Sequence, residues 1–210
     1  MVKIKSFSDA LRQYRDGFGY LNDPDKVHIA IPNAKQVLWE AMTYLLSTEG
    51  RTPQWLPAYD QVADWLTDNQ GRGLLCIGSC GLGKSFLCRQ ILPVIIFQYY
   101  ELVVPLYDAT KIDLKTMAKI NSEHLFSIDD IGTETELVEY GKRSLPFQDI
   151  VDNAEKRNSL MLLSTNLVPK HTVSGGKTIP SIEDMYGLRT LDRLRGLTKV
   201  VIFKGESFRK

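Results

Sequence analysis

Eight residues at positions 78–85, GSCGLGKS, have the spacing of a phosphate-binding loop, G-x-x-x-x-G-K-[ST]. The glycines of this pattern let successive backbone N–H groups turn toward phosphates, and the helix that follows adds the positive end of its dipole. We expect Lys84 to lie on an exposed loop and to reach the β- and γ-phosphates, and Ser85 to hold Mg²⁺. The sequence therefore predicts a site for ATP with Mg²⁺, formed by Gly78, Ser79, Cys80, Gly81, Leu82, Gly83, Lys84 and Ser85.

Two neighbouring acids end an apolar run about 45 residues after Lys84, in the sequence LFSIDDIG. An apolar strand that ends in two acids can place one carboxylate near Mg²⁺ and the other near an attacking water. We therefore predict that Asp129 is the metal-linked acid and that Asp130 is the general base or the acid that orients the water. Acids at strand ends are often only solvated turn residues, so the preceding strand and the distance from Lys84 carry this prediction.

Asn166 follows a third apolar run, SLMLLST. At the end of a buried strand its amide can sit beside the γ-phosphate, between the phosphate-binding loop and the acidic strand. Asparagine is equally an ordinary residue of turns that end strands. Asn166 is therefore a candidate catalytic residue only in combination with the two motifs above.

Strands alternating with helices must position these groups. From about residue 73 onward, short runs that are apolar throughout alternate with segments of helical spacing, which predicts a parallel sheet covered on both faces, an α/β fold of three layers. The first seventy residues instead have helical periodicity punctuated by prolines. We expect a helical N-terminal segment at 1–70 and an ATPase domain at 71–210. The expected strands are 73–78, 102–109, 125–130, 159–166 and 199–203.

The composition sets limits on the class of protein. A chain of 210 residues, 43% hydrophobic and 24% charged, fits one globular domain with a core. The net charge of +1 gives no overall basic field, although a neutral protein can still bind DNA through a local patch. No apolar run approaches the roughly 20 residues of a membrane span, and the N-terminal residues lack the apolar stretch of a signal peptide. We expect a cytoplasmic protein with no membrane partner, whose three cysteines form neither a zinc site nor a disulfide framework.

Three arginines near the C-terminus help to interpret the motifs described above. Arg189 and Arg193 stand four apart on one predicted helix, and Arg209 follows the last predicted strand. Such arginines are usually a solvated helix face. Here, together with the loop and the acids, the chain from about 72 to 210 resembles the AAA+ ATPases of the DnaC-type helicase-loader and IstB-type transposition-helper group. That group has YG-x-R-x-x-x-RL on a helix, then a strand and G-x-S-[YF]-R, which this sequence matches with Tyr186, Gly187, Arg189, Arg193, Leu194, Gly205, Ser207, Phe208 and Arg209.

The resemblance implies a fold and several roles. It implies a AAA+ P-loop core with a five-stranded parallel sheet in the order 5-1-4-3-2. Asn166 would be the first sensor, and Arg193 the arginine finger that reaches ATP on a neighbouring subunit. Arg209 would be the second sensor and would touch ATP in its own subunit, with Arg189 a candidate helper at the subunit interface.

Two stretches depart from the pattern of the group. The helical insertion that helps DnaC-type proteins to grip single-stranded DNA is reduced to the short segment TKIDLKTMAKINSEH, so direct contact with DNA is left open. The stretch VPKHTVSGGKTIPS after Asn166 is longer than the pattern requires and carries Lys170, His171 and Lys177. We expect it to be a flexible surface loop, with a partner-binding loop as the alternative.

Three classes of function remain. The resemblance favours an ATP hydrolase that assembles with itself and delivers or remodels a protein on DNA. The first choice is a replicative helicase loader acting on a helicase, and the alternative is a transposition helper acting on a transposase. A small-molecule P-loop kinase is a different class, which would need an acceptor lid that the sequence does not suggest. A nucleotide-dependent scaffold with slow turnover is the third, since Asp130 stands where faster AAA+ enzymes have glutamate.

Overall fold

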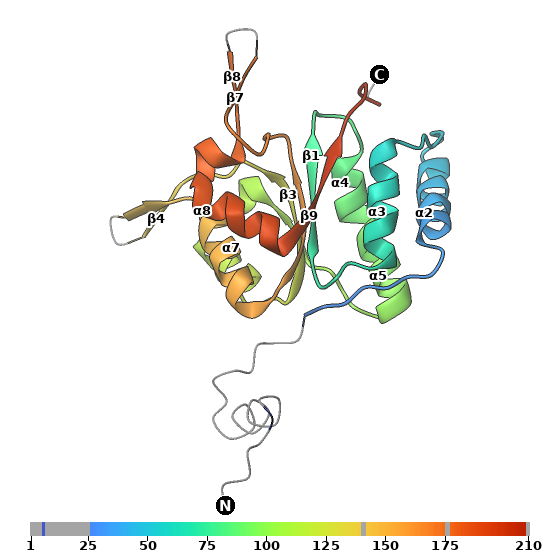
Figure 1. Cartoon of the computed structure of the whole chain (residues 1–210), viewed down its shortest axis with the longest axis horizontal. Coiled ribbons are helices and arrows are strands. Elements are labelled where there is room, and N and C mark those ends of the chain that lie inside the picture. Colours follow the sequence, from blue (N-terminus) through green and yellow to red (C-terminus); the bar gives the residue numbers. More distant parts are fainter. Residues whose placement is uncertain (1–5, 7–25, 140–141, 175–176, 209–210) are drawn as a thin grey trace, which may run out of the picture.

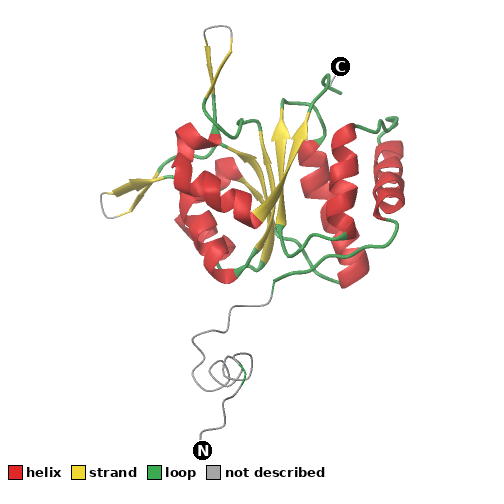
Figure 2. Cartoon of the chain, in the orientation of Figure 1, coloured by secondary structure: helices red, strands yellow, loops and turns green. Residues whose placement is uncertain are grey.

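The computed structural model describes residues 6, 26–139, 142–174 and 177–208. Its centre is a five-stranded parallel sheet in the order β2-β3-β6-β1-β9 (Figures 1 and 2). If these five strands are numbered 1 to 5 along the chain and the sheet is read from β9, the order is 5-1-4-3-2, which confirms the prediction. The carboxyl ends of parallel strands meet at one edge of the sheet, and this edge carries the phosphate-binding loop. The five strands are Gly73–Gly78 (β1), Leu106–Asp108 (β2), Leu125–Ile131 (β3), Leu160–Thr165 (β6) and Thr198–Phe203 (β9).

Helices cover both faces of the sheet, as the apolar runs predict. On one face the core contains α2, α3 and the helical segment after the phosphate-binding loop; on the other it contains α6, α7 and α8. Figure 1 shows these two layers on either side of the strands. The helices are Ala34–Thr48 (α2), Pro57–Thr67 (α3), Lys84–Phe86 (α4), Leu92–Tyr100 (α5), Leu114–Ile120 (α6), Pro146–Arg157 (α7) and Ile182–Leu197 (α8).

The helices before β1 belong to the same core as the strands. Trp65, Leu66 and Leu38 are fully buried in one hydrophobic cluster with Leu74 of β1 and with α5. Asn69 connects the segment further, because its side chain accepts a hydrogen bond from the Ile29 N–H and donates one to the Val27 carbonyl. α3 therefore packs on the sheet against β9, and α2 packs on α3 and on the helical segment after the phosphate-binding loop.

The helix after the phosphate-binding loop is not continuous. Between α4 and α5 the chain forms one turn of π-helix, η1 (Leu87–Ile91), in which the Leu92 N–H bonds to the Leu87 carbonyl. Pro93 has no N–H to donate, so the bonding pattern of the following turn is broken. The Cys88 carbonyl is instead satisfied by the Ser127 hydroxyl of β3 at 3.0 Å. The π-turn thus attaches this helix to the acidic strand.

β3 has a bulge where the two acids lie. The three residue steps from Ile128 to Ile131 oppose only two steps on β6, from Leu163 to Thr165. Asp130 adopts a left-handed backbone conformation, with φ of 56°. A regular strand would send neighbouring side chains to opposite faces, whereas a bulge can redirect one of them.

Two short antiparallel hairpins leave the body of the molecule. The first is Leu137–Glu139 (β4) with Lys142–Ser144 (β5), and the second is Thr172–Ser174 (β7) with Lys177–Ile179 (β8). The second corrects the expectation of a flexible loop after Asn166, since cross-strand backbone pairing orders most of that stretch. Figure 1 shows both hairpins projecting on the side of α7 and α8.

Other boundaries also differ from expectation. The second strand begins only at Leu106, not at 102, and the segment up to β3 contains only a 3₁₀ turn, η2 (Ala109–Lys111), and α6. α8 contains a kink at Gly187, whose φ and ψ are 81° and 164°. No helix in the described ranges is long and apolar enough to cross a membrane.

Candidate nucleotide-binding site

A cavity of about 640 Å³ opens beside the phosphate-binding loop, at the carboxyl end of β1. One wall is polar and comes from the loop together with Asp130 and Asn166. The opposite wall comes from α2 and from the segment that leads into α3. The full lining is Met42, Leu46, Arg51, Thr52, Gln54, Leu56, Tyr59, Cys80, Gly81, Leu82, Gly83, Lys84, Ser85, Phe86, Asp130, Asn166, Glu206, Ser207 and Phe208.

Lys84 is buried rather than exposed, which corrects the expectation for its loop. Only 4% of the residue is exposed. Its Nζ donates hydrogen bonds to the carbonyls of Gly78 (2.7 Å) and Ser79 (2.8 Å) and to Oδ1 of Asn166 (2.9 Å). Burial lowers the pKa of Lys84, against the opposing effect of nearby acidic groups that include Asp130. All three acceptors are uncharged, so no direct partner among the residues that the structure describes neutralises the ammonium charge.

Two glycines of the loop are required by space as well as by conformation. Gly81 and Gly83 have φ of 81° and 83°. A Cβ on Gly81 would lie 2.0 Å from the Ser207 hydroxyl oxygen, and one on Gly83 would lie 2.8 Å from the Tyr59 hydroxyl oxygen. The loop is therefore closely covered by α3 and by the residues after β9.

The C-terminal residues lie on the phosphate-binding loop. The Phe208 N–H donates to the Gly81 carbonyl at 2.9 Å, and Glu206, Ser207 and Phe208 line the cavity. The predicted second sensor, Arg209, is outside the described residues.

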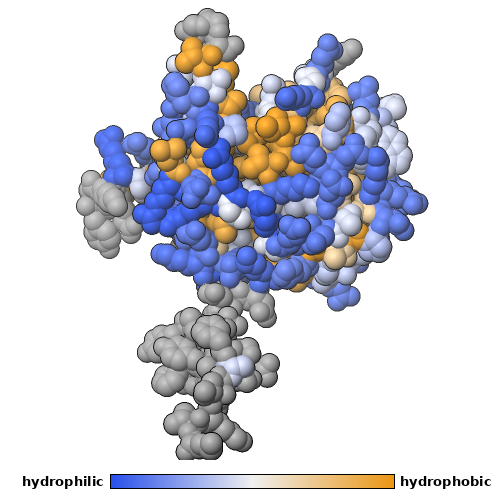
Figure 3. Space-filling model, viewed as in Figure 1, coloured by the Kyte–Doolittle hydropathy of each residue, from blue (hydrophilic) through white to orange (hydrophobic). Residues whose placement is uncertain are grey.

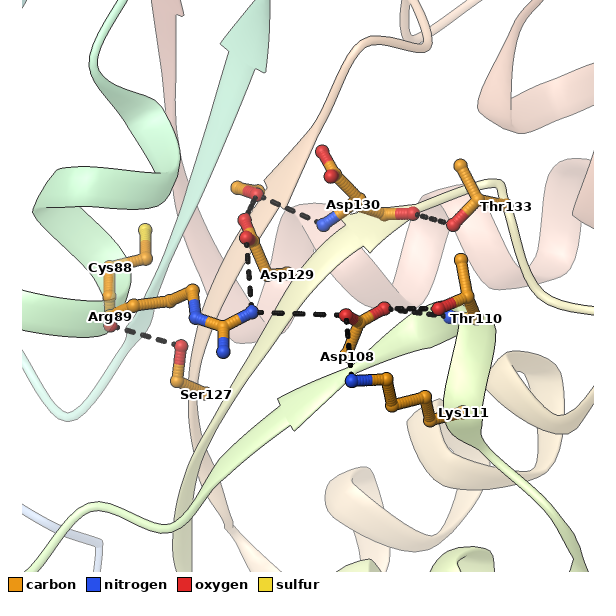
Figure 4. Close-up of polar contacts among 10 residues, drawn as sticks. Cys88, Arg89, Asp108, Thr110, Lys111, Ser127, Asp129, Asp130 and Thr133 are labelled. Atoms are coloured by element: carbon orange, nitrogen blue, oxygen red, sulfur yellow. Dashed lines mark hydrogen bonds and ion pairs between the residues drawn. The ribbon is translucent and has the colours of Figure 1, made fainter.

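The bulge separates the two acids. Asp130 lines the cavity, whereas Asp129 is 5% exposed and is not part of the lining. The Asp129 carboxylate accepts a hydrogen bond from the Ser164 hydroxyl and lies 3.5 Å from Nη1 of Arg89. Arg89 also lies 4.0 Å from Asp108 of β2, and Figure 4 shows the Asp130 carboxylate pointing away from this group.

This donor set fits Mg²⁺ in part. Mg²⁺ prefers oxygen ligands and is usually bound through one or two carboxylates together with phosphate oxygens. Ser85 and Asp130 present oxygens at the cavity. Asp129 does not line the cavity and is already paired with Arg89. It therefore fits best as a group that would act on Mg²⁺ indirectly and not as a direct ligand.

Asn166, the candidate catalytic residue after the third apolar run, lies beside Lys84. It follows β6, its amide oxygen contacts Lys84, and it lines the same cavity as Asp130. The structure thus brings together Lys84, Ser85, Asp130 and Asn166 from three different strand ends.

Arg193 lies apart from this cavity. Its side chain is 14% exposed and forms ion pairs with two acids of α7, Asp152 and Glu155, the latter at 2.7 Å from Nε. Arg189, one turn earlier on α8, is exposed. Within one chain, neither arginine lines the cavity.

Sequence reasoning did not find the apolar wall of the cavity. Tyr59 lines this wall and also belongs to a row of aromatic rings whose other members lie outside the lining. Trp39 to Trp55, Trp55 to Tyr59 and Tyr59 to Phe203 have centroid distances of 5.9, 5.6 and 5.7 Å. Burial raises the pKa of Tyr59 to about 12, so its hydroxyl stays protonated beside the loop. The prolines around this segment mark a turn, but nothing local in the sequence says that it faces the loop.

The chain combines a five-stranded parallel sheet between two layers of helices with a phosphate-binding-loop sequence at the carboxyl end of β1. Comparison with solved structures agrees: the crystal structure of the DnaC helicase loader superimposes with a TM-score of 0.53 at 14% identity, over 80% of this chain and 98% of that one. The chain thus has the fold of the DnaC-type AAA+ ATPases, which confirms the fold implied by the sequence resemblance.

Two further structures are similar at lower scores. DnaI gives a TM-score of 0.47 at 18% identity, over 66% of this chain and 73% of that one. AMPPCP-bound DnaA from Aquifex aeolicus gives 0.41 at 14% identity, over 85% and 49%. No protein-family model and no curated protein sequence matches the chain.

Proposed function

We propose that this protein is an AAA+ ATPase that binds and hydrolyses ATP as an oligomer of itself. The observation that carries the proposal is the convergence of Lys84, Asp130 and Asn166 on one cavity beside the phosphate-binding loop. The cavity has a polar end suited to phosphates and an apolar wall of Met42, Leu46 and other side chains suited to a base.

The roles follow from the geometry. Lys84 would exchange its neutral acceptors for phosphate oxygens, because a charged acceptor makes the stronger hydrogen bond. Ser85 would bind Mg²⁺, with Asp129 behind it, and Mg²⁺ would neutralise charge on the phosphates. Asp130 would accept a proton from the attacking water or orient it, and Asn166 would contact the γ-phosphate.

Assembly would complete the site. Arg193 does not reach the cavity of its own chain, so a contribution to catalysis must come across a subunit boundary. An arginine supplied in trans stabilises charge on the γ-phosphoryl oxygens and can raise the rate by about 10³–10⁵. Figure 3 shows a hydrophobic area between α8 and α3, and Leu188 and Ile202 are 66% and 47% exposed, which suits a surface that another chain covers.

For the biological role we propose a loader of a replicative helicase, on the likeness to the DnaC fold and the C-terminal motifs. A helper of DNA transposition that acts on a transposase has the same motifs. Direct binding of DNA is not part of the proposal, because the segment between β2 and β3 holds only η2 and the seven residues of α6.

A second candidate, a switch with slow turnover, is favoured by one observation. Arg193 is charge-compensated by two acids of its own chain, which opposes its release toward a neighbour. A small-molecule kinase, from a different class, is less well supported, since the described insertions are two β-hairpins rather than a helical acceptor lid.

Mixing two inactive variants tests the proposal. Arg193→Ala protein should bind ATP normally but hydrolyse it slowly, and Lys84→Ala protein should not bind ATP. Their mixture should regain activity, because a Lys84→Ala subunit can lend its Arg193 to an intact neighbouring site. Arg209→Ala, predicted to act within its own subunit, should not be rescued by the same partner. Wild-type specific activity should rise with protein concentration.

Arg193→Lys serves as the control, since it keeps a positive charge for the acids of α7 but loses the planar guanidinium. A mixture that stays inactive, with wild-type activity per subunit independent of concentration, would show that hydrolysis needs no neighbour. Turnover only in the presence of a nucleoside acceptor would identify a kinase.

A further inference from the structure

A buried carboxylate that the proposed reaction does not use lies four residues after Asp130. Glu134 is 7% exposed and belongs to the irregular segment between β3 and β4. Its Oε2 accepts a hydrogen bond from the Gly132 N–H at 2.9 Å, and its Oε1 accepts one from the Tyr186 hydroxyl. A buried acid needs such donors, and this one obtains one from its own turn and the other from α8, far along the chain.

Tyr186 is fixed from several sides. It is 2% exposed, its ring packs against Phe147 of α7 with centroids 5.1 Å apart, and its carbonyl accepts a hydrogen bond from Gln148 at 2.8 Å. Burial, and then the charge of Glu134, raises the pKa of Tyr186, so that its hydroxyl remains a donor. Tyr186 immediately precedes the kink at Gly187, after which α8 carries Arg189 and Arg193.

The segment that Glu134 anchors begins at the residue proposed to activate water. Asp130 has a positive φ of 56°, a backbone region that costs free energy for residues other than glycine, although aspartate tolerates it better than most. Its N–H is 3.2 Å from the Ser164 hydroxyl, and its carbonyl accepts a hydrogen bond from Thr133 at 2.7 Å. The Glu134–Gly132 hydrogen bond closes the same turn from the other end.

We propose that Glu134 and Tyr186 are a pair of positioning residues: they hold the turn 130–134 so that Asp130 faces the cavity, and they join this turn to the helix that carries the arginines. Neither residue lines the cavity, so the pair acts through Asp130 and not on the nucleotide. The inference rests on the proposed role of Asp130 in hydrolysis.

The first test needs no nucleotide. Amide hydrogen exchange, resolved by residue, is compared in the wild type, Tyr186→Phe and Tyr107→Phe. Tyr107 is the matched control, because its buried hydroxyl has no hydrogen-bond partner in the described part of the chain. We expect Tyr186→Phe to speed exchange at Gly132 about tenfold, the size expected for one lost hydrogen bond, with the loop 78–85 unchanged. Unchanged protection at Gly132 would overturn the proposal.

The second test separates positioning from folding. Tyr186→Phe and Glu134→Ala should each lower kcat about tenfold while the Kd for ATP stays within about twofold of wild type. Glu134→Gln should recover part of the loss, since it keeps an acceptor for Gly132 and a group that can bond to Tyr186. The double variant Glu134→Ala/Tyr186→Phe should lose little more than either single variant, as expected for one coupled pair.

The outcomes keep this inference apart from the proposed function. A wild type that binds ATP and never hydrolyses it would refute the proposed function, while exchange at Gly132 would still decide whether the pair holds the turn. A wild type with normal turnover and a Tyr186→Phe variant equal to it would refute the pair alone. A parallel loss of kcat, ATP affinity and thermal stability would show that the pair only supports the fold.

Discussion

Lys84, which is buried, and Arg193, which is half-buried, are two cations with different surroundings. Lys84 donates its hydrogen bonds to two backbone carbonyls and one amide oxygen, which are neutral. Arg193 is held by two carboxylates, Asp152 and Glu155. Phosphate oxygens can displace neutral acceptors with a gain in charge pairing, whereas they must compete with charged ones. In the proposed function, Lys84 can therefore exchange its partners for phosphate oxygens more easily than Arg193 can.

The difference separates what one subunit can do from what needs a second. The groups proposed to bind the nucleotide all belong to one chain, so binding should not depend on assembly. Release of Arg193 requires a competing negative charge from outside, such as the γ-phosphate of a neighbour. Binding and hydrolysis should consequently respond to different variants, and four predictions test this in order of expected effect.

The largest effect should follow from Lys84→Ala. It removes the cation of the cavity that contacts the loop carbonyls, and ATP affinity should fall at least about a hundredfold, as expected for loss of a charge-assisted contact to phosphate. Calorimetric titration measures it. The three acceptors left behind can cost about 1–3 kcal/mol of stability unless water from the cavity reaches them, so thermal unfolding is the control. Unchanged ATP affinity would contradict the assignment of the loop.

Asp130→Asn should leave binding of ATP with Mg²⁺ intact and slow hydrolysis. The substitution removes a proton acceptor that faces the cavity, and general base catalysis contributes about 10²–10⁴-fold. Single-turnover measurement at saturating ATP isolates this step. If turnover is unchanged and ATP binding is lost instead, the roles of the two acids are reversed.

Asp129→Asn should act mainly on the dependence on Mg²⁺. The carboxylate lies behind the cavity, between Ser164 and Arg89, so its loss should weaken Mg²⁺-dependent ATP binding about tenfold, less than a direct ligand would. Titration with Mg²⁺ at a fixed ATP concentration measures this change in Mg²⁺-dependent ATP binding. Arg89→Gln is a useful companion, because it removes the cation and keeps the acid.

The smallest effect should come from Asp152→Asn combined with Glu155→Gln. Without the two charges Arg193 is easier to release, and hydrolysis at low protein concentration should rise about twofold to fivefold, the equivalent of less than one kcal/mol in the barrier. Asp149→Asn, an exposed acid of the same helix, is the matched control. A fall in activity would show that the acids orient Arg193 for catalysis instead of restraining it.

The fold could be predicted from sequence because its signals are local. β1, β3 and β6 are buried on both faces, and the uninterrupted apolar runs of their sequences predict this burial. The phosphate-binding loop needs only its own glycines and the helix after it. Even the missed hairpin after Asn166 had a local signal, since Gly175 and Gly176 separate two alternating stretches.

The rest depends on pairings between distant residues. The bulge that turns Asp130 into the cavity is a register shift against β6, and a strand pattern alone cannot show it. The ion pairs of Arg193 need α7 to pack beside α8, and the spacing of Arg189 and Arg193 fixes only a helix face. Lys84 is buried because α3 and the C-terminal residues cover the loop.

The row of aromatic rings gives the protein its own optical signal. Of its three tryptophans, Trp55 is one ring away from Tyr59, whose hydroxyl lies against Gly83, while Trp65 is buried with its indole N–H bonded to the Arg72 carbonyl. A nucleotide that enters the cavity changes the surroundings of Tyr59 and, through it, those of Trp55. Intrinsic fluorescence of the unlabelled protein should therefore follow nucleotide binding in real time. Trp65 should contribute a constant background, and a Trp55→Phe variant would keep this background.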